Sequence, residues 1–243
     1  DKKTHRIIMS LNKFKISFLL ILVGLLALFG FRKNEARIIR ASDIHFIESE
    51  FKFSSKDSVN KLLTQTDIFS NKILKSNLNL KGIEQQILLN KYIDFADVSI
   101  SVDGKVGIKI IEKNPVFRVL NDRYYIDAIG RKMPLSSRFS KSVPLILNDV
   151  DFEDLKVMGE LGNYIEKNNF LKNHISTLSY EDEDLVFTLN DFSYELNIKG
   201  FNEYDSKFKN YESFFLKVYS SGLLDSLKSI NLNFKNQVII QRK

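Results

Sequence analysis

The chain has 243 residues, which is room for one or two domains beside any targeting segment. Hydrophobic residues make up 44% and charged residues 27%, a composition typical of a folded chain rather than a disordered one. Cysteine is absent, which excludes disulfides and cysteine-ligated metal or redox sites. Residues 1–33 carry seven Lys and Arg against one Asp, and this accounts for the whole net charge of +6. The rest of the chain is neutral by count, so no nucleic-acid partner is expected.

An uncharged apolar run at residues 16–31 predicts a single transmembrane helix. As a helix it is roughly 24 Å long, a little shorter than the hydrocarbon core, and its flanking basic side chains can extend the span. The run ends without a small-residue cleavage site, which favours an uncleaved anchor over a secretory signal peptide. Basic residues lie on both sides of the span, so their distribution gives only a weak preference for one orientation. Length is the stronger argument, because a short basic tail stays in the cytoplasm while the long remainder is exported. We therefore expect a cytoplasmic tail at 1–15, a juxtamembrane linker at 32–42 and an exported remainder.

Residues 43–114 predict a strand, two helices and two further strands, in that order. The first strand is expected at 44–53, which is rich in Ile and Phe, and Ser54 then begins a capping-box pattern for the first helix. Asn79 is placed to cap the second helix. Alternating apolar residues on both sides of an Asp-Gly pair at 103–104 predict a β-hairpin.

Residues 115–243 predict a mixed β-sheet domain with flanking helices, so the fold class is α+β. An amphipathic helix is expected over 152–168 and a second over 204–218, where aromatic residues recur at spacings of three and four. Short apolar segments predict the strands. They lie at 117–120, 123–128, 143–147, 175–180, 185–189, 194–198, 230–234 and 238–240.

No arrangement of residues in the sequence indicates catalysis. A G-x-S-x-G elbow, an H-E-x-x-H pair and a Gly-rich phosphate loop are all missing, so we expect no catalytic residues, cofactor or metal. The acidic run 181–184 offers oxygen ligands for a hard cation, but a solvated hairpin turn is the favoured interpretation. His45 has no ligand nearby in sequence and is interpreted as structural. The sequence therefore favours a binding function over catalysis.

The most informative segment for an interaction is 237–241, which is β-prone and follows a predicted strand. If it forms the edge of a sheet, its unpaired backbone groups can accept a strand from a partner. If it lies inside the sheet, both of its sides are already paired. The sequence alone leaves these two alternatives open.

Taken in order, these elements resemble the FtsQ/DivIB family of bacterial cell-division proteins over nearly the whole chain. A short basic tail and one anchor precede a unit that is similar to a POTRA domain. Four short segments are similar to family sequence at corresponding places: 110–116 (IIEKNPV), 125–130 (YIDAIG), 143–146 (VPLI) and 230–234 (INLNF). The last segment has Asn231 where the family usually has Asp, and Asn233 near a usual Arg or Lys. The order and spacing of the segments carry the resemblance.

The resemblance implies a non-enzymatic divisome scaffold in the bacterial cytoplasmic (inner) membrane, with its bulk periplasmic, at the division site. It implies a POTRA-like domain at 43–114 and a β domain at 115–243. The implied partners are small single-pass coiled-coil division proteins of the FtsB and FtsL types, with other divisome proteins. A strand of the partner would add to the last strands of the β domain. Carried over to this chain, the docking positions are Phe234, Asn236, Gln237, Val238, Ile239 and Ile240.

Two other classes of protein are alternatives to the scaffold. A POTRA-containing component of a secretion or outer-membrane assembly system would be expected to show repeated POTRA units and a long barrel, whereas one unit and no barrel-length strand series are predicted here. An anchored periplasmic enzyme would need a cleft with paired acids, and the sequence offers only the run 181–184.

Overall fold

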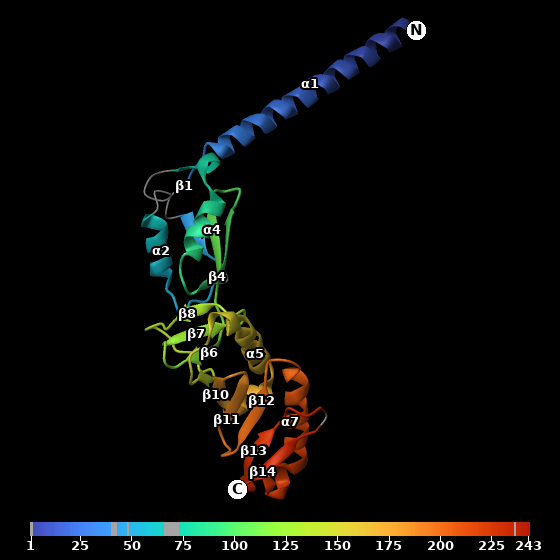
Figure 1. Cartoon of the computed structure of the whole chain (residues 1–243). Helices are drawn as coiled ribbons and strands as arrows, with labels where there is room; N and C mark the ends of the chain where they lie inside the picture. The colour runs from blue at the N-terminus through green and yellow to red at the C-terminus, as the bar shows by residue number, and fades with distance from the viewer. Residues whose placement is uncertain (1, 40–42, 48, 66–72, 236) are drawn as a thin grey trace. The chain divides into compact units, whose positions relative to one another are not determined.

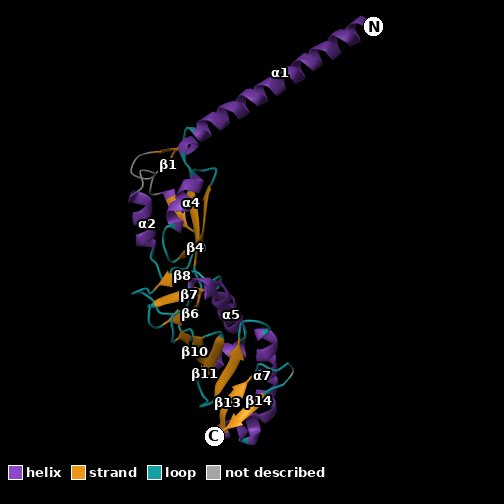
Figure 2. Ribbon diagram, in the orientation of Figure 1, coloured by secondary structure: helices purple, strands orange, loops and turns teal. Residues whose placement is uncertain are grey.

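The structure, a computed structural model, describes residues 2–39, 43–47, 49–65, 73–235 and 237–243 (Figure 1). The chain divides into two compact units, each of which contains both helices and strands (Figure 2). Unit 1 comprises residues 1–50, 55–90 and 95–111, and unit 2 comprises residues 51–54, 91–94 and 112–243. The α+β class predicted from the sequence is confirmed.

Helix α1 runs over Lys2–Glu35 and contains the predicted apolar span. The segment Phe14–Glu35 is long and apolar enough to cross a membrane, with a mean hydropathy of 2.4. None of its most apolar stretch is buried inside the protein, which a core helix would require. The helix continues beyond 16–31 at both ends, because nothing in the flanking basic segments breaks it.

Unit 1 contains the expected order of strand, two helices and two strands. These elements are β2 (Ile44–Phe46), α2 (Lys56–Gln65), α4 (Leu80–Leu88), β4 (Ile93–Ile100) and β5 (Val106–Glu112). The three strands form one sheet in the order β2-β5-β4, with β2 parallel to β5. Asn79 caps α4 as predicted, its Oδ1 accepting from the Gly82 amide at 3.0 Å. Two short strands, β1 (Ile38–Ile39) and β3 (Ile73–Leu74), pair separately, and the sequence analysis missed both.

The strand expected at 44–53 is shorter than predicted. Strand β2 ends at Phe46. Further along, the Glu112 carboxylate accepts the backbone amides of Lys52, Phe53 and Ser54 at 2.8, 2.9 and 2.7 Å. A side chain here takes the donors that a neighbouring strand would have taken, so apolar composition alone overestimated the strand.

Unit 2 is built on a nine-stranded mixed sheet with the order β14-β13-β12-β11-β10-β9-β6-β7-β8. Most neighbours are antiparallel, while β9 is parallel to both β6 and β10, and β12 is parallel to β13. The strands are β6 (Pro115–Val119), β7 (Tyr124–Asp127), β8 (Lys132–Pro134), β9 (Leu145–Ile146), β10 (Ile175–Glu181), β11 (Asp184–Leu189), β12 (Glu195–Lys199), β13 (Leu227–Asn231) and β14 (Ile239–Arg242).

Three helices accompany this sheet: α5 (Leu155–Lys167), α6 (Asn169–His174) and α7 (Tyr204–Val218). Helix α7 matches its prediction from end to end, and its Phe208, Tyr211 and Phe215 are buried in the main core. It connects the parallel pair β12 and β13, which need a crossover of this kind. The predicted helix at 152–168 begins later, at Leu155, because Phe152 belongs to a 3-10 turn and is 86% exposed.

The turn after β7 is held by a buried carboxylate. The Asp127 side chain is 2% exposed, and it accepts from the amides of Ile129 and Arg131 at 3.1 and 2.7 Å. Arg131 Nε also donates to it at 2.6 Å. Gly130 has φ +86°, and a Cβ there would lie 2.5 Å from the backbone of α5. The turn at the end of the 125–130 segment therefore depends on the Asp127 carboxylate and on the absence of a side chain at Gly130.

Candidate functional site

Strand β14 lies at one edge of the nine-stranded sheet (Figure 1). It pairs with β13 in an antiparallel register that places Ile239 opposite Asn231 and Ile240 opposite Ile230. Within the described residues, no strand pairs with its other side. Of the two alternatives that the sequence left open, the tertiary structure therefore selects the edge.

The hairpin that carries β14 is tied to the sheet by its two asparagines. Asn231 Oδ1 accepts from the Asn233 amide at 2.9 Å, and Asn233 Oδ1 accepts from the amide of Lys199 on β12. These are the two positions where the sequence differs from the usual residues of the family it resembles. Neutral amide side chains here organise the turn through hydrogen bonds instead of a salt bridge.

The predicted docking residues separate into two groups. Val238 and Ile240 are half-buried against the main core and hold the strand in place. Phe234 and Ile239 are 49% and 44% exposed, and Gln237 is also exposed. Phe234 lies in the bend after β13 rather than in a strand, which corrects the prediction of a strand over 230–234. Asn236 lies outside the described residues.

The direction of the backbone groups shows which of them face the free side of β14. The Lys243 amide donates to the Ser226 carbonyl at 3.0 Å and therefore points toward β13. Backbone groups alternate in direction along a strand, so the amides of Ile240 and Arg242 point toward the free edge. The Lys243 ammonium also donates to Ser193 Oγ and to the Asp225 carbonyl, both at 2.9 Å, which anchors this end.

The opposite edge of the sheet is less suited to accept a strand. Strand β8 has three residues, Lys132–Pro134, and its central Met133 is fully buried. Pro134 has no amide to donate, and proline with charged neighbours is a common way of protecting an edge. Strand β14 contains no proline and carries two adjacent isoleucines.

The acidic run 181–184 and His45, which the sequence disfavoured as ligand sites, lie in a hairpin turn and on an exposed strand position. Glu181 ends β10 and Asp184 begins β11, and the two residues between them, Asp182 and Glu183, have φ of 48° and 68°. This geometry is a tight hairpin turn. His45 is exposed on β2. Among the described residues, no three His, Asp or Glu side chains gather as metal ligands.

A charged pocket in unit 2 was missed entirely by the sequence analysis. It has a volume of about 630 Å³ and lies where the two-residue strand β9 separates β6 from β10. Its charged side chains come from four separate segments: Arg118, Lys141, Glu166 and Lys172. Residues this far apart in sequence give no local pattern, so only the fold brings them together.

The chain thus combines a helix that is long and apolar enough to span a membrane with an α+β unit whose sheet, among the described residues, has an open edge at β14. The family model described as "FtsQ/DivIB, C-terminal related" matches residues 114–240, just over half of the chain. The chain belongs to this family, which gives it a role in bacterial cell division. Together with α1, this membership fits a membrane-anchored cell-division protein of the scaffold type.

One solved structure similar to this chain is the major extracytoplasmic domain of the bacterial cell-division protein DivIB from Geobacillus stearothermophilus, in its trans isomer. The sequence identity is 14%, and the TM-score is 0.35. The similarity covers 45% of this chain and 96% of that one. Among curated proteins, none matches this chain.

Proposed function

We propose that the chain is a divisome scaffold that binds small single-pass coiled-coil proteins of the FtsB and FtsL types. A strand of the partner adds to β14, and the complex helps to control septal peptidoglycan synthesis. The observation that carries the proposal is the open edge of β14 in a chain that belongs to a cell-division family. The same family membership favours the scaffold over a secretion or outer-membrane assembly component.

Two kinds of contact would hold the added strand. The outward backbone groups of Ile240 and Arg242 supply main-chain hydrogen bonds, which give affinity without depending on sequence. The exposed faces of Phe234 and Ile239 supply apolar contacts beside the strand. Because β14 is already fixed against β13 and the core, the partner alone loses conformational freedom when the strand forms.

The proposed topology rests on the short length of the basic tail, and the distribution of charge adds only a weak preference. The basic segment before the span stays in the cytoplasm, and the units after it lie on the other side of the inner membrane at the division site. We also propose that residues 43–114 act as a POTRA-like domain and offer a second protein-binding surface near the membrane, while 115–243 form the partner-binding β domain.

The test is co-purification of the full chain from membranes with tagged FtsB-type and FtsL-type proteins of the same genome. In Arg242→Pro, the mutation removes an amide that faces the free edge and leaves the ladder to β13 unbroken. Arg242→Gln is the matched control, because it removes the same charge and keeps the amide. Recovery of the partner is expected to fall at least tenfold in the proline variant and to stay unchanged in the control.

Circular dichroism of both purified variants must show the same fold as the unmutated chain. Equal recovery of the partners with both folded variants would place the docking surface elsewhere. If the partners fail to co-purify even with the unmutated chain, the identity of the partners is wrong, whatever the state of the edge.

A further inference from the structure

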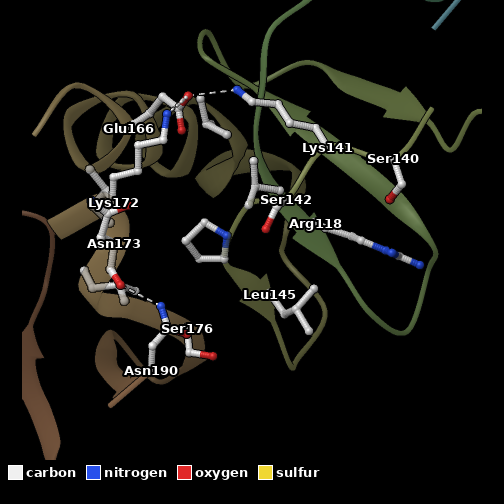
Figure 3. A pocket seen from close by; sticks show the side chains of 15 residues that line it. Arg118, Ser140, Lys141, Ser142, Leu145, Glu166, Lys172, Asn173, Ser176 and Asn190 are labelled. Carbon is white, nitrogen blue, oxygen red and sulfur yellow. Dashed lines mark hydrogen bonds and ion pairs between the residues drawn. The ribbon is translucent and has the colours of Figure 1, made fainter. Parts of the chain in front are cut away.

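The lining of the pocket between β6 and β10 has more cationic than anionic side chains. Its lining has three cationic side chains and a single carboxylate, that of Glu166. Figure 3 shows Lys141 and Lys172 converging on Glu166 at one side of the pocket, with Arg118 on the opposite side of Ser142. The charge distribution therefore has two separate positive positions with neutral lining between them.

All three donors of the Lys141 ammonium are occupied by acceptors within the protein. Its ammonium donates to Asn114 Oδ1 at 2.7 Å, to the Pro115 carbonyl at 3.0 Å and to Glu166 Oε1 at 3.0 Å. An ammonium has three protons to donate, so none is left for a ligand. The role of Lys141 is to hold the 140–144 segment against α5.

Lys172 has spare capacity. It also donates to Glu166 Oε1, at 3.0 Å, and its side chain is 45% exposed. Burial raises the pKa of Glu166, but the hydrogen bonds from Lys172 and Lys141 outweigh this effect, so the pKa is lowered and the carboxylate stays ionised. Two ammonium groups share this one negative charge, which leaves a surplus of one positive charge.

Arg118 supplies the second surplus charge. Its Nε is buried without an acceptor, although a buried guanidinium nitrogen is normally hydrogen-bonded. In the described part of the chain, no carboxylate, carbonyl or hydroxyl accepts from its side chain. A guanidinium that is held by β6, and whose buried Nε has no acceptor among the described residues, is matched in geometry to a carboxylate from outside the protein.

We propose that this pocket binds an acidic segment of a partner polypeptide in an extended conformation, separately from the β14 edge. One carboxylate of the segment pairs with Arg118 and a second with Lys172. Apolar side chains between them contact Pro144 and Leu145, and the hydroxyls of Ser142 and Ser176 face the bound backbone.

Size and lining select a peptide rather than a small inorganic anion. A volume of about 630 Å³ lies in the range of pockets that bind extended organic ligands and is many times larger than one phosphate needs. The two free cationic positions lie on opposite sides of Ser142, whereas a phosphate site would gather its donors around one point.

The test uses a fluorescein-labelled pentapeptide of alternating glutamate and leucine, and its glutamine counterpart, with the full chain in detergent micelles. Fluorescence anisotropy at low ionic strength should show binding of the glutamate peptide only, weakening as salt is added. Arg118→Gln and Lys172→Gln should each weaken binding about tenfold, the loss of one charge-assisted contact. Lys217→Gln removes an exposed lysine from α7 and should change nothing.

Near-UV circular dichroism of the purified variants shows whether the fold is kept. Unchanged binding in the Arg118→Gln, Lys172→Gln double variant would overturn the proposal, as would equal binding of the glutamine peptide. Displacement of the peptide by millimolar inorganic phosphate, with the same dependence on Arg118, would assign the pocket to a small anion instead. Arg242→Pro should leave peptide binding intact, and loss of binding there would refute the independence of the two surfaces.

Discussion

Replacing Asp127 by alanine should destabilise unit 2 locally and strongly. Its carboxylate accepts two backbone amides and the Arg131 guanidinium within 3.1 Å, and the side chain is 2% exposed. Hydrogen bonds to a charged acceptor contribute about 1.5–3 kcal/mol each, and an orphaned amide adds a desolvation cost. Arg131 retains Asp94 as a partner, so its charge is not left alone. Counting only the two backbone amides, at the lower end of about 1.5 kcal/mol each, gives an expected loss of about 3 kcal/mol.

Amide hydrogen exchange read by mass spectrometry is the suitable assay, because the chain has two units and need not unfold in one step. A loss of about 3 kcal/mol corresponds to roughly a hundredfold faster exchange in peptides from 115–134. Asp122→Ala is the matched control, since this exposed aspartate lies on the preceding turn and should change stability by less than about 0.5 kcal/mol. Exchange in Asp127→Ala within threefold of the control would refute the reasoning.

Three further predictions concern the interior of unit 2. Burial lowers the pKa of His174 while the charge of Asp191 opposes the shift, so the unfolded chain binds the proton more readily. Stability should therefore be complete above pH 6.5 and fall as the pH drops below it, and His174→Gln should flatten that dependence in denaturant titrations. Gly162→Ala places a Cβ 2.6 Å from Val116 Cγ2 and should cost about 1–3 kcal/mol, seen as a lower Tm. Glu112→Gln should speed exchange of the amides at 52–54, because a neutral amide oxygen binds three donors less well than a carboxylate.

Each of these expectations has a clear contrary result. A free energy of unfolding that stays constant between pH 7.5 and pH 5 would show that His174 does not make stability depend on pH. The same pH dependence in His174→Gln as in the unmutated chain would show this too. An unchanged Tm in Gly162→Ala would mean that helix and strand separate at little cost. Exchange at 52–54 that does not respond to Glu112→Gln would show that another group holds these amides.

The elements that the sequence predicted well are those whose residues carry a strong local pattern. The aromatic spacing over 204–218 reproduced α7 from end to end, and Asn79 marked the cap of α4. Local prediction failed where a distant side chain replaced a strand partner, as Glu112 does at 52–54. It also failed for β1 and β3, which are two residues long and too short to show a period.

For the candidate sites too, some features follow from local sequence and others only from the tertiary structure. The sequence by itself predicted a last strand at 238–240, which the structure places at Ile239–Arg242, and a charge surplus beside the apolar helix, because both depend on composition and short-range alternation. Only the tertiary structure decided that, among the described residues, no strand pairs with the outer side of β14, since an edge is defined by the absence of a neighbour. It also brought Arg118 and Lys172 to one pocket, because β9 is too short to fill the space between β6 and β10. Strand order is a long-range property of the whole sheet, and no local pattern encodes it.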